Sequence, residues 1–397
     1  PCMFDTKADV LIVGGGVIGC SIAYSLSAAP EGDGLRICVV ERDSTYTRSS
    51  TALSVGGIRQ QFSTPENIQL SLFSEAFIRE AGQTLAVDGE GPDLGYQPRG
   101  YLFLATEKGI PVLQRNHIRQ VKLGASVQLL DPKGLQTRFP WMDTSDLAGG
   151  SLGLRGEGWL DPFSFLQALK KKAGYQGVSF ITGEAVGFSI EGGKVRAVGL
   201  ADGRTVTVGQ VVNAAGPGAA KLAELAGIPD LPVHSRKRFV YRIHTLDELP
   251  DCPLVVDPSG VYFRPEGDGF LCGVSPSPKN DPDTFDLDMD YDLFHEKVWP
   301  VLAARVPSFD KLRLGPSWAG HYAYNVVDQN AILGPHPDLE NFFFANGFSG
   351  HGLQHAPGIG RALSELLLFG EYRSLDLTRF EFQRFSRNRP IREENVV

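Results

Sequence analysis

The amino-acid sequence predicts an α/β fold: a Rossmann-like nucleotide-binding domain joined to a second, α+β domain that rests on an antiparallel sheet. Three observations carry this prediction. An apolar run at 10–13 is followed by a glycine-rich turn and an apolar-periodic stretch, which is the strand, turn and helix order of a dinucleotide fingerprint. Between 178 and 213 the pattern changes to short alternating runs broken by glycines, which predicts an antiparallel meander. A second glycine-rich turn lies at 347–352.

The first turn, at 14–19, has the residue types that a bound pyrophosphate requires. Gly14 permits the tight turn, Gly16 lets the backbone approach the phosphates, and Gly19 lets the following helix pack on its strand. The free N–H groups of that helix would face the phosphates. Glu41 ends the next apolar strand, where a carboxylate accepts hydrogen bonds from ribose hydroxyls. We therefore interpret the turn as a dinucleotide site; the alternative is a glycine-rich turn in some other α/β protein.

The length and the charge of the chain limit its class. A chain of 397 residues exceeds what one core usually supports, so two domains are expected. A net charge of −8 argues against nucleic acid as a partner. We expect a discontinuous nucleotide-binding domain at 1–84, 150–227 and 319–380, a substrate or cap domain at 85–149 and 228–318, and a C-terminal tail at 381–397.

Cysteine spacing and hydropathy bear on the compartment. The five cysteines, at 2, 20, 38, 252 and 272, form no C-x-x-C pair, which favours a reducing compartment. No run of about 18 apolar residues occurs, so no membrane span is predicted. The histidines show no zinc-ligand spacing, so no metal site is predicted. The chain starts at Pro1 without a signal-like segment, and we expect a product from which a targeting sequence has been removed.

The middle of the chain separates two architectures. After the meander, a buried strand at 211–216 ends in small residues that let the backbone approach a ligand. A nicotinamide dehydrogenase needs neither this insertion nor a second small-residue turn, and only the turn at 14–19 supports that alternative. The arrangement is similar to the two-dinucleotide-binding, glutathione-reductase-like architecture, in which a long FAD lies extended across several segments.

Four segments carry a family resemblance. The runs 39–43, 50–58, 213–216 and 347–352 resemble the superfamily of D-amino-acid oxidase, sarcosine oxidase and dimethylglycine dehydrogenase. The resemblance extends from about residue 9 to the C-terminus and implies an FAD-binding domain with a cap domain over the flavin.

A closer resemblance lies in the runs 60–70, 324–330 and 356–361. These are similar to a mitochondrial branch of the superfamily that is needed for assembly of respiratory complex I. The resemblance implies a flavoprotein of the mitochondrial matrix, associated with the inner membrane, whose partners are complex I subunits or assembly intermediates.

The turns and the resemblance together name the residues expected to bind the cofactor. Glu41 would hold the adenosine ribose, Ser50 and its neighbours would approach the pyrophosphate, and the turn after Ser349 would face the flavin N1–C2=O edge, with a helix starting near Pro357. For His351 we favour an orienting role over proton abstraction. The full set is Gly14, Gly16, Val17, Gly19, Glu41, Arg42, Ser49, Ser50, Thr51, Gly56, Gly57, Ile58, Val186, Ala214, Ala215, Gly216, Gly350, His351, Gly352, Leu353 and Gln354.

Departures from the family pattern bear on the attachment and reactivity of FAD. Leu53 stands where some relatives have a flavin-linked histidine, and the segment 320–325 lacks the cysteine of sarcosine oxidases, so non-covalent FAD is expected. Gln354 replaces a substrate-binding lysine, and no basic residue lies at 271–272, where those oxidases activate oxygen. Fast reaction with oxygen is therefore not expected.

The candidate catalytic residues are polar groups over the flavin ring. Arg264 is the preferred partner of a substrate carboxylate, and each candidate has an alternative structural role. The set is Arg264, Tyr262, Gln354 and Arg59.

Two functions follow. The resemblance favours an FAD-binding complex I assembly factor with residual oxidoreductase activity. The alternative is an FAD-dependent dehydrogenase or oxidase of a small amine or N-methyl amino acid, in which a hydride leaves the α-carbon.

The C-terminal stretch 379–392 interleaves five arginines with phenylalanines. It would either meet an anionic membrane or a partner, or pack on the domain with its arginines reaching solvent, which we favour.

Overall fold

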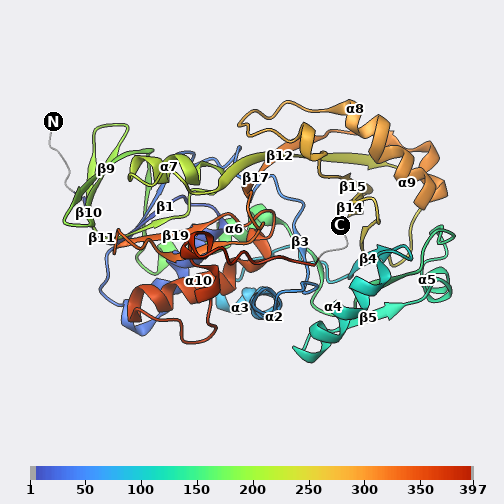
Figure 1. Cartoon of the computed structure of the whole chain (residues 1–397), viewed down its shortest axis with the longest axis horizontal. Coiled ribbons are helices and arrows are strands. Elements are labelled where there is room, and N and C mark those ends of the chain that lie inside the picture. The colour runs from blue at the N-terminus through green and yellow to red at the C-terminus, as the bar shows by residue number, and fades with distance from the viewer. Residues whose placement is uncertain (1–5, 395–397) are drawn as a thin grey trace.

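The computed structural model describes residues 6–394, which form two large sheets side by side (Figure 1). One sheet has eight strands and the other nine. The predicted α/β fold with a second, largely antiparallel sheet is confirmed. Residues 1–5 and 395–397, which include Cys2 and the outer ends of the first and last predicted segments, lie outside the described residues. Within residues 6–394, no helix has the length and hydropathy to cross a membrane.

The eight-stranded sheet has the order β18-β19-β11-β1-β2-β8, with β10 and β9 continuing from β11. β1 runs parallel to both β2 and β11, so the carboxyl ends of the three strands, at Val13, Val40 and Asn213, lie side by side. Ligands bind at the carboxyl ends of the strands in such folds. The strands are β1 (Thr6–Val13), β2 (Ile37–Glu41), β8 (Ser179–Thr182), β9 (Ala185–Glu191), β10 (Lys194–Leu200), β11 (Thr205–Asn213), β18 (Ile332–Pro335) and β19 (Phe342–Asn346).

The predicted meander is shorter than expected. β9, β10 and β11 are antiparallel, as the alternating pattern predicts. β8 instead pairs parallel with β2, because it follows helix α6 (Pro162–Tyr175), and a strand reached through a helical crossover lies parallel in the sheet.

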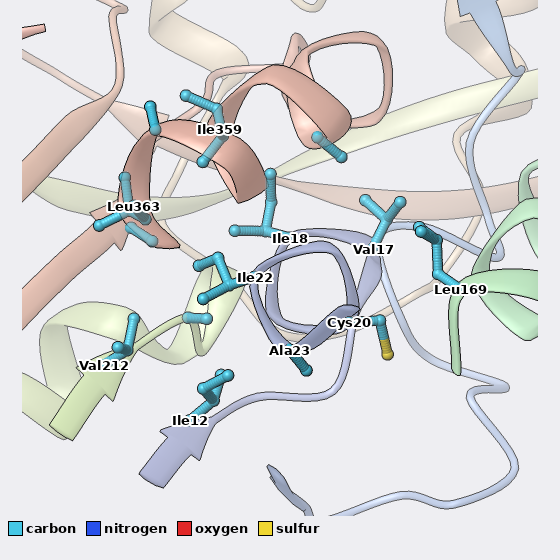
Figure 2. Close-up of a cluster of buried hydrophobic side chains, with 14 of the residues drawn as sticks. Ile12, Val17, Ile18, Cys20, Ile22, Ala23, Leu169, Val212, Ile359 and Leu363 are labelled. Carbon is cyan, nitrogen blue, oxygen red and sulfur yellow. The ribbon is translucent and has the colours of Figure 1, made fainter. Parts of the chain in front are cut away.

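Helix α1 (Val17–Ala28) lies at the centre of the first core, between the sheet and α10 (Gly352–Phe369). Figure 2 shows Ile18 and Ile22 of α1 on the side that faces Ile359 of α10. The two helices approach closely because α10 carries Gly360, where a Cβ would lie 2.5 Å from the Ser21 carbonyl oxygen. This packing fixes the start of α10 relative to the first glycine turn.

The nine-stranded sheet has the order β16-β12-β15-β14-β13-β4-β6-β5, with β17 also paired to β12. The long β12 runs from beside α7 in the first half of the molecule into this second sheet (Figure 1). The strands of the nine-stranded sheet are β4 (Tyr101–Ala105), β5 (Val127–Leu130), β6 (Gly149–Gly153), β12 (Val233–His244), β13 (Leu254–Val256), β14 (Tyr262–Glu266), β15 (Gly269–Gly273), β16 (Arg313–Leu314) and β17 (Trp318–Asn325).

The remaining elements connect the two sheets or cover them. The short strands β3 (Gly57–Ile58) and β7 (Gly158–Trp159) pair with each other. The helices are α2 (Pro65–Arg79), α3 (Ala81–Thr84), α4 (Ile110–Lys122), α5 (Pro132–Arg138), α7 (Ala219–Leu225), α8 (Tyr291–Leu293), α9 (Trp299–Arg305) and α11 (Gln383–Ser386), with single turns η1 (Pro30–Gly32), η2 (Gly216–Gly218), η3 (Pro278–Asn280), η4 (Phe294–Val298), η5 (Pro307–Lys311) and η6 (Thr378–Phe380).

The C-terminal segment packs on the first half of the molecule. Arg384 is buried and donates to both carboxylate oxygens of Asp328, at 2.8 and 2.9 Å. Glu393 accepts a hydrogen bond from the Ser63 amide at the start of α2, at 2.6 Å. Phe380 is fully buried. The packed arrangement favoured for the tail therefore fits the described residues better than a free basic arm.

Candidate cofactor and substrate site

A cavity of about 1390 Å³ brings together the two glycine turns, which lie more than three hundred residues apart in the sequence. It also reaches β12, β14 and β17 of the second sheet. Of the residues predicted from the sequence, it is lined by Gly14, Gly16, Val17, Glu41, Arg42, Ser49, Ser50, Thr51, Gly57, Arg59, Ala214, Ala215, Gly216, Tyr262, Gly350, His351, Gly352, Leu353 and Gln354.

The first turn is fixed by close backbone approach. Gly14 has φ +108°, and a Cβ there would lie 2.2 Å from the carbonyl oxygen of Ala214. A Cβ at Gly19 would lie 1.9 Å from the Gly14 carbonyl oxygen. At Gly16, by contrast, a Cβ would meet only the Thr51 hydroxyl, at 3.5 Å. The protein itself therefore requires glycine at the first two positions, whereas Gly16 leaves open space toward the cavity.

Glu41 is held at the carboxyl end of β2 by two backbone donors. Its carboxylate accepts from the Gly15 amide at 2.8 Å and from the Asp43 amide at 2.9 Å. The loop after β2 docks on the first helix, since the Val17 amide donates to the Thr51 hydroxyl at 3.1 Å. These contacts align a carboxylate, a helix N-terminus and a hydroxyl-rich loop along one wall.

The second turn closes the other end of the same wall. Gly350 has φ +94°, and a Cβ there would lie 2.5 Å from the Tyr322 ring. Helix α10 begins at Gly352, five residues before Pro357, because the turn itself supplies the first helical turn: the His355 amide donates to the His351 carbonyl at 3.2 Å. The first N–H groups of a helix lack helical acceptors, and here the first residues of the helix, 352–354, line the cavity.

Arg59 is a buried cation that faces the cavity. Only 9% of its surface is exposed, and its guanidinium lies over the rings of Phe62 and Phe103, at 4.4 and 5.1 Å. Its Nη2 is 3.2 Å from Nε2 of His351. Burial and the Arg59 charge hold the pKa of His351 well below its usual value, so that imidazole is neutral and can accept a hydrogen bond.

Gln354, a predicted catalytic residue, supports Arg59. Its side-chain oxygen accepts from the Arg59 amide at 2.9 Å. The amide group therefore has a structural partner in the chain, and it fixes the backbone from which the Arg59 side chain enters the cavity.

Glu157 is a supporting residue that the sequence interpretation missed. It is fully buried and accepts from the Gln60 amide at 2.7 Å and from the Gln61 side chain at 2.8 Å. Burial raises the pKa of its carboxyl to about 7. A Cβ at Gly153 would lie 1.9 Å from this carboxylate, so the glycines around 149–158 make its site. That cluster of glycines was the available signal.

Arg264, the preferred carboxylate partner, does not line the cavity. Its Nε donates to the Val55 carbonyl at 2.9 Å, and its Nη1 donates to the Pro265 carbonyl at 2.8 Å and pairs with Glu266. Its donors are thus directed into the protein. Of the two predicted arginines, Arg59 lines the cavity and Arg264 does not. Tyr262 lines it and stays protonated, because burial raises its pKa well above the usual value.

Four predicted cofactor residues stand behind the lining or beside it. A Cβ at Gly56 would lie 2.0 Å from the Leu160 carbonyl oxygen, so this glycine permits packing. Ile58 is buried and Gly19 packs against the first turn. Val186 is 47% exposed, and its neighbours 183–185 line the cavity in its place.

The family model of FAD-dependent oxidoreductases matches residues 9–366. The chain belongs to this FAD-dependent oxidoreductase family. It is 45% identical to the "FAD-dependent oxidoreductase domain-containing protein 1" of Xenopus laevis, over 98% of this chain and 85% of that protein. Among solved structures it is similar to L-proline dehydrogenase from P. horikoshii (TM-score 0.87, 26% identity, 98% of this chain and 100% of that one) and to glycine oxidase from Geobacillus kaustophilus (TM-score 0.81, 25% identity, 96% and 99%).

FAD is the cofactor of the protein, and the residues of the cavity fit it. Ser50 lines the cavity, and its buried hydroxyl has no hydrogen-bond partner among the described residues, so it has a bond left to offer a phosphate. The open space at Gly16 and the held carboxylate of Glu41 match the pyrophosphate and the ribose of a dinucleotide. These are the groups that would hold its adenosine half.

The cavity lining also bears on covalent attachment. Leu53 lines the cavity, and within the described residues no cysteine does. His321 lines it, but its Nε2 is 2.7 Å from the Asp286 carbonyl oxygen. Residues 6–394 hold no group of three histidine, cysteine or acidic side chains that could bind a metal ion.

Proposed function

We propose that this FAD-dependent oxidoreductase binds FAD non-covalently and oxidises a small amine or amino acid that carries a carboxylate. The observation that carries the proposal is Arg59, a buried arginine that lines the cavity together with two tyrosines, Tyr262 and Tyr322. Bound FAD supplies the acceptor for the two electrons of the oxidation. The similarity to proteins titled L-proline dehydrogenase and glycine oxidase supports this substrate class.

The cavity residues define how such a substrate would be held. Arg59 would bind the carboxylate through charge-assisted hydrogen bonds, with its backbone fixed by Gln354. Neutral His351 and protonated Tyr262 leave Arg59 as the cation at this end of the cavity. Tyr101 and Phe103 form aromatic walls of the cavity, and by displacing water around a bound carboxylate they would strengthen the ion pair.

Electrons would pass to an acceptor other than oxygen. Leu271 and Cys272, which stand where sarcosine oxidases are expected to have an oxygen-activating lysine, are buried and do not line the cavity.

Anaerobic addition of sarcosine, L-proline, glycine and D-alanine to the flavin-loaded protein tests the proposal. We expect at least one of them to bleach the flavin absorbance. The substitution Arg59→Gln should raise the concentration of that substrate needed for half-saturation by about ten- to a hundredfold. Arg59→Lys should restore part of the affinity. If the whole panel leaves the spectrum unchanged, the oxidation proposal fails.

We also propose, from the sequence resemblance, that the protein serves the assembly of respiratory complex I in the mitochondrial matrix, at the inner membrane. The runs 60–70, 324–330 and 356–361 support this proposal, together with the 45% identity to the Xenopus relative. Arg384 and Glu393 hold the tail on the protein, whereas Arg387, Arg389 and Arg392 are exposed and could take part in a peripheral membrane contact.

Affinity purification of the tagged protein from mitochondria tests the assembly role. Complex I subunits should be recovered with it, and cells that lack the protein should accumulate subassemblies. Intact complex I in those cells would contradict the role, whatever the flavin chemistry shows.

A further inference from the structure

The C-terminal segment 384–394, which we call the strap, is fastened to the loop that follows β17. Arg384 pairs with Asp328 through two hydrogen bonds, and the Ile391 amide donates to the same carboxylate at 2.9 Å. The Asn330 side chain donates to the Ile391 carbonyl at 2.9 Å. Asp328 and Asn330 do not line the cavity, so these polar residues serve the strap and not the cofactor.

Glu393, near the end of the strap, places its carboxylate at the start of α2. It accepts from the Ser63 amide at 2.6 Å and from the Ser63 hydroxyl at 2.7 Å. The Thr64 amide and the Asn67 side chain also donate to it, at 3.2 and 2.6 Å. Burial raises the pKa of this carboxyl, but the hydrogen bonds outweigh burial and leave the pKa below its usual value. The group is therefore an anion at a helix N-terminus, which is a favourable place for it.

The residues that Glu393 holds are separated from Arg59 by a short loop, 59–64. Phe62 of this loop is fully buried, and its ring lies 4.4 Å from the Arg59 guanidinium. The same ring packs against the imidazoles of His351 and His355, with ring centres 5.1 and 5.0 Å apart. Phe62 therefore lies between the point where the strap is attached and the cation of the substrate site.

The backbone of loop 59–64 is held by side chains from other parts of the chain. Gln354 holds the first amide of the loop and Glu157 the second. Further along, Gln120 donates to the Phe62 carbonyl at 3.0 Å. A loop held in this way keeps its position only while those contacts persist. The strap supplies the contacts at the far end of the loop, although none of residues 384–394 lines the cavity.

We propose that the strap takes part in substrate recognition: Glu393 is a positioning residue that, through loop 59–64, fixes Arg59 where it binds a substrate carboxylate. The inference rests on the proposed function, because the carboxylate site at Arg59 belongs to that proposal. It assigns to the sequence runs 60–70 and 324–330 the role of holding the C-terminal end of the chain.

Calorimetric titration of the flavin-loaded full chain with tetrahydro-2-furoate tests the inference. This carboxylate has oxygen in place of the proline nitrogen, so it cannot be oxidised as an amine. Glu393→Gln should raise its dissociation constant by about three- to tenfold, and Glu393→Asp, which keeps the charge, should restore part of the affinity. The matched control is Glu394→Gln, since that exposed carboxylate pairs only with Arg115, at 3.4 Å. The control should leave the dissociation constant unchanged.

A double-mutant cycle shows whether Glu393 acts through Arg59. In the Arg59→Gln protein, the added substitution Glu393→Gln should not change the dissociation constant of the probe further, because the group that Glu393 positions is gone. A general structural role would instead weaken binding by the same factor in both backgrounds. Equal factors, or equal effects of Glu393→Gln and Glu394→Gln, would overturn the inference.

Hydrogen exchange tests the inference without any carboxylate. Glu393→Gln should speed amide exchange in loop 59–64, whereas exchange in α1, which lies in the first core, should stay parental. Unchanged exchange in the loop, or faster exchange in both segments, would overturn the inference. If the parental protein binds no probe, or if Arg59→Gln leaves binding unchanged, the proposed function fails, and exchange in the loop alone then decides whether the strap holds Arg59.

Discussion

The two ends of the cavity are built by different means. At the nucleotide end the backbone decides: Gly14 and Gly19 are required because other backbone atoms lie within 3 Å of where a Cβ would be. At the opposite end, side chains from distant segments make the site: Gln354 holds the backbone amide of Arg59, and Glu157 holds that of the next residue, Gln60. A backbone requirement is local and leaves a pattern in the sequence, whereas a side-chain constellation depends on which groups the fold brings together.

The sharpest challenge to the nucleotide end is Gly14→Ala. The new methyl group would lie 2.2 Å from the Ala214 carbonyl oxygen at φ +108°, so we expect a loss of more than about 4 kcal/mol of unfolding free energy and loss of bound FAD. Thermal unfolding and flavin absorbance per chain measure both. Gly34→Ala is the matched control: it also has positive φ, +77°, but no atom within 4 Å, and should cost only about 1 kcal/mol. Equal effects would show that strain, not close approach, decides.

At the opposite end, Glu157→Gln tests the buried support of Arg59 through pH. The folded protein keeps the Glu157 proton up to about pH 7, whereas the usual value is 4.5. The folded state therefore binds more protons between these values, and stability falls as pH rises through that window, by on the order of 3 kcal/mol. Urea unfolding at pH 5 and pH 8 should show a smaller difference for Glu157→Gln. Glu248→Gln, at an exposed position, is the control and should keep the parental pH dependence of stability. If both variants kept that dependence, Glu157 would not be its source.

The two arginines provide the next test. Arg59→Gln should weaken binding of a substrate carboxylate by about 2 kcal/mol, since a charge-assisted pair is lost, with little change in thermal stability. Arg264→Gln should do the reverse, because its donors hold Val55, Pro265 and Glu266. Half-saturation constants and melting temperatures of both variants distinguish the substrate-binding arginine from the structural one. Weakened carboxylate binding only in Arg264→Gln would restore the interpretation made from the sequence.

The smallest expected effect is at Gly16. Its Cβ position meets only the Thr51 hydroxyl at 3.5 Å, so Gly16→Ala should fold normally without FAD. Its FAD affinity should fall by about tenfold, because the methyl group occupies space next to the pyrophosphate. Titration of apoprotein with FAD measures the affinity. A lower melting temperature of the Gly16→Ala apoprotein would show that the fold itself, and not FAD binding, requires glycine at this position.

The sequence was sufficient for the fold and for the nucleotide end. The spacing of Gly14, Gly16 and Gly19 and the position of Glu41 identify a strand, a turn and a helix, because each residue type answers a steric or hydrogen-bonding need within one βαβ unit. The same reasoning placed the second turn, although α10 begins before Pro357.

The other end was harder to predict. Arg59 follows the short strand β3 and Arg264 lies within β14, and nothing in the sequence ranks one above the other. Only the contacts of Arg264 with Val55 and Glu266 show that it points into the protein. Glu157 lies in a glycine-rich stretch without a motif, and its role depends on two residues almost a hundred positions away.

The central claim is that the cavity holds FAD without a covalent bond, and acid precipitation of the purified, flavin-loaded protein tests it most directly. The account predicts about one FAD per chain, released completely into the supernatant. Flavin retained in the pellet would contradict non-covalent binding, and a colourless protein that takes up no added FAD would contradict the assignment of the cavity.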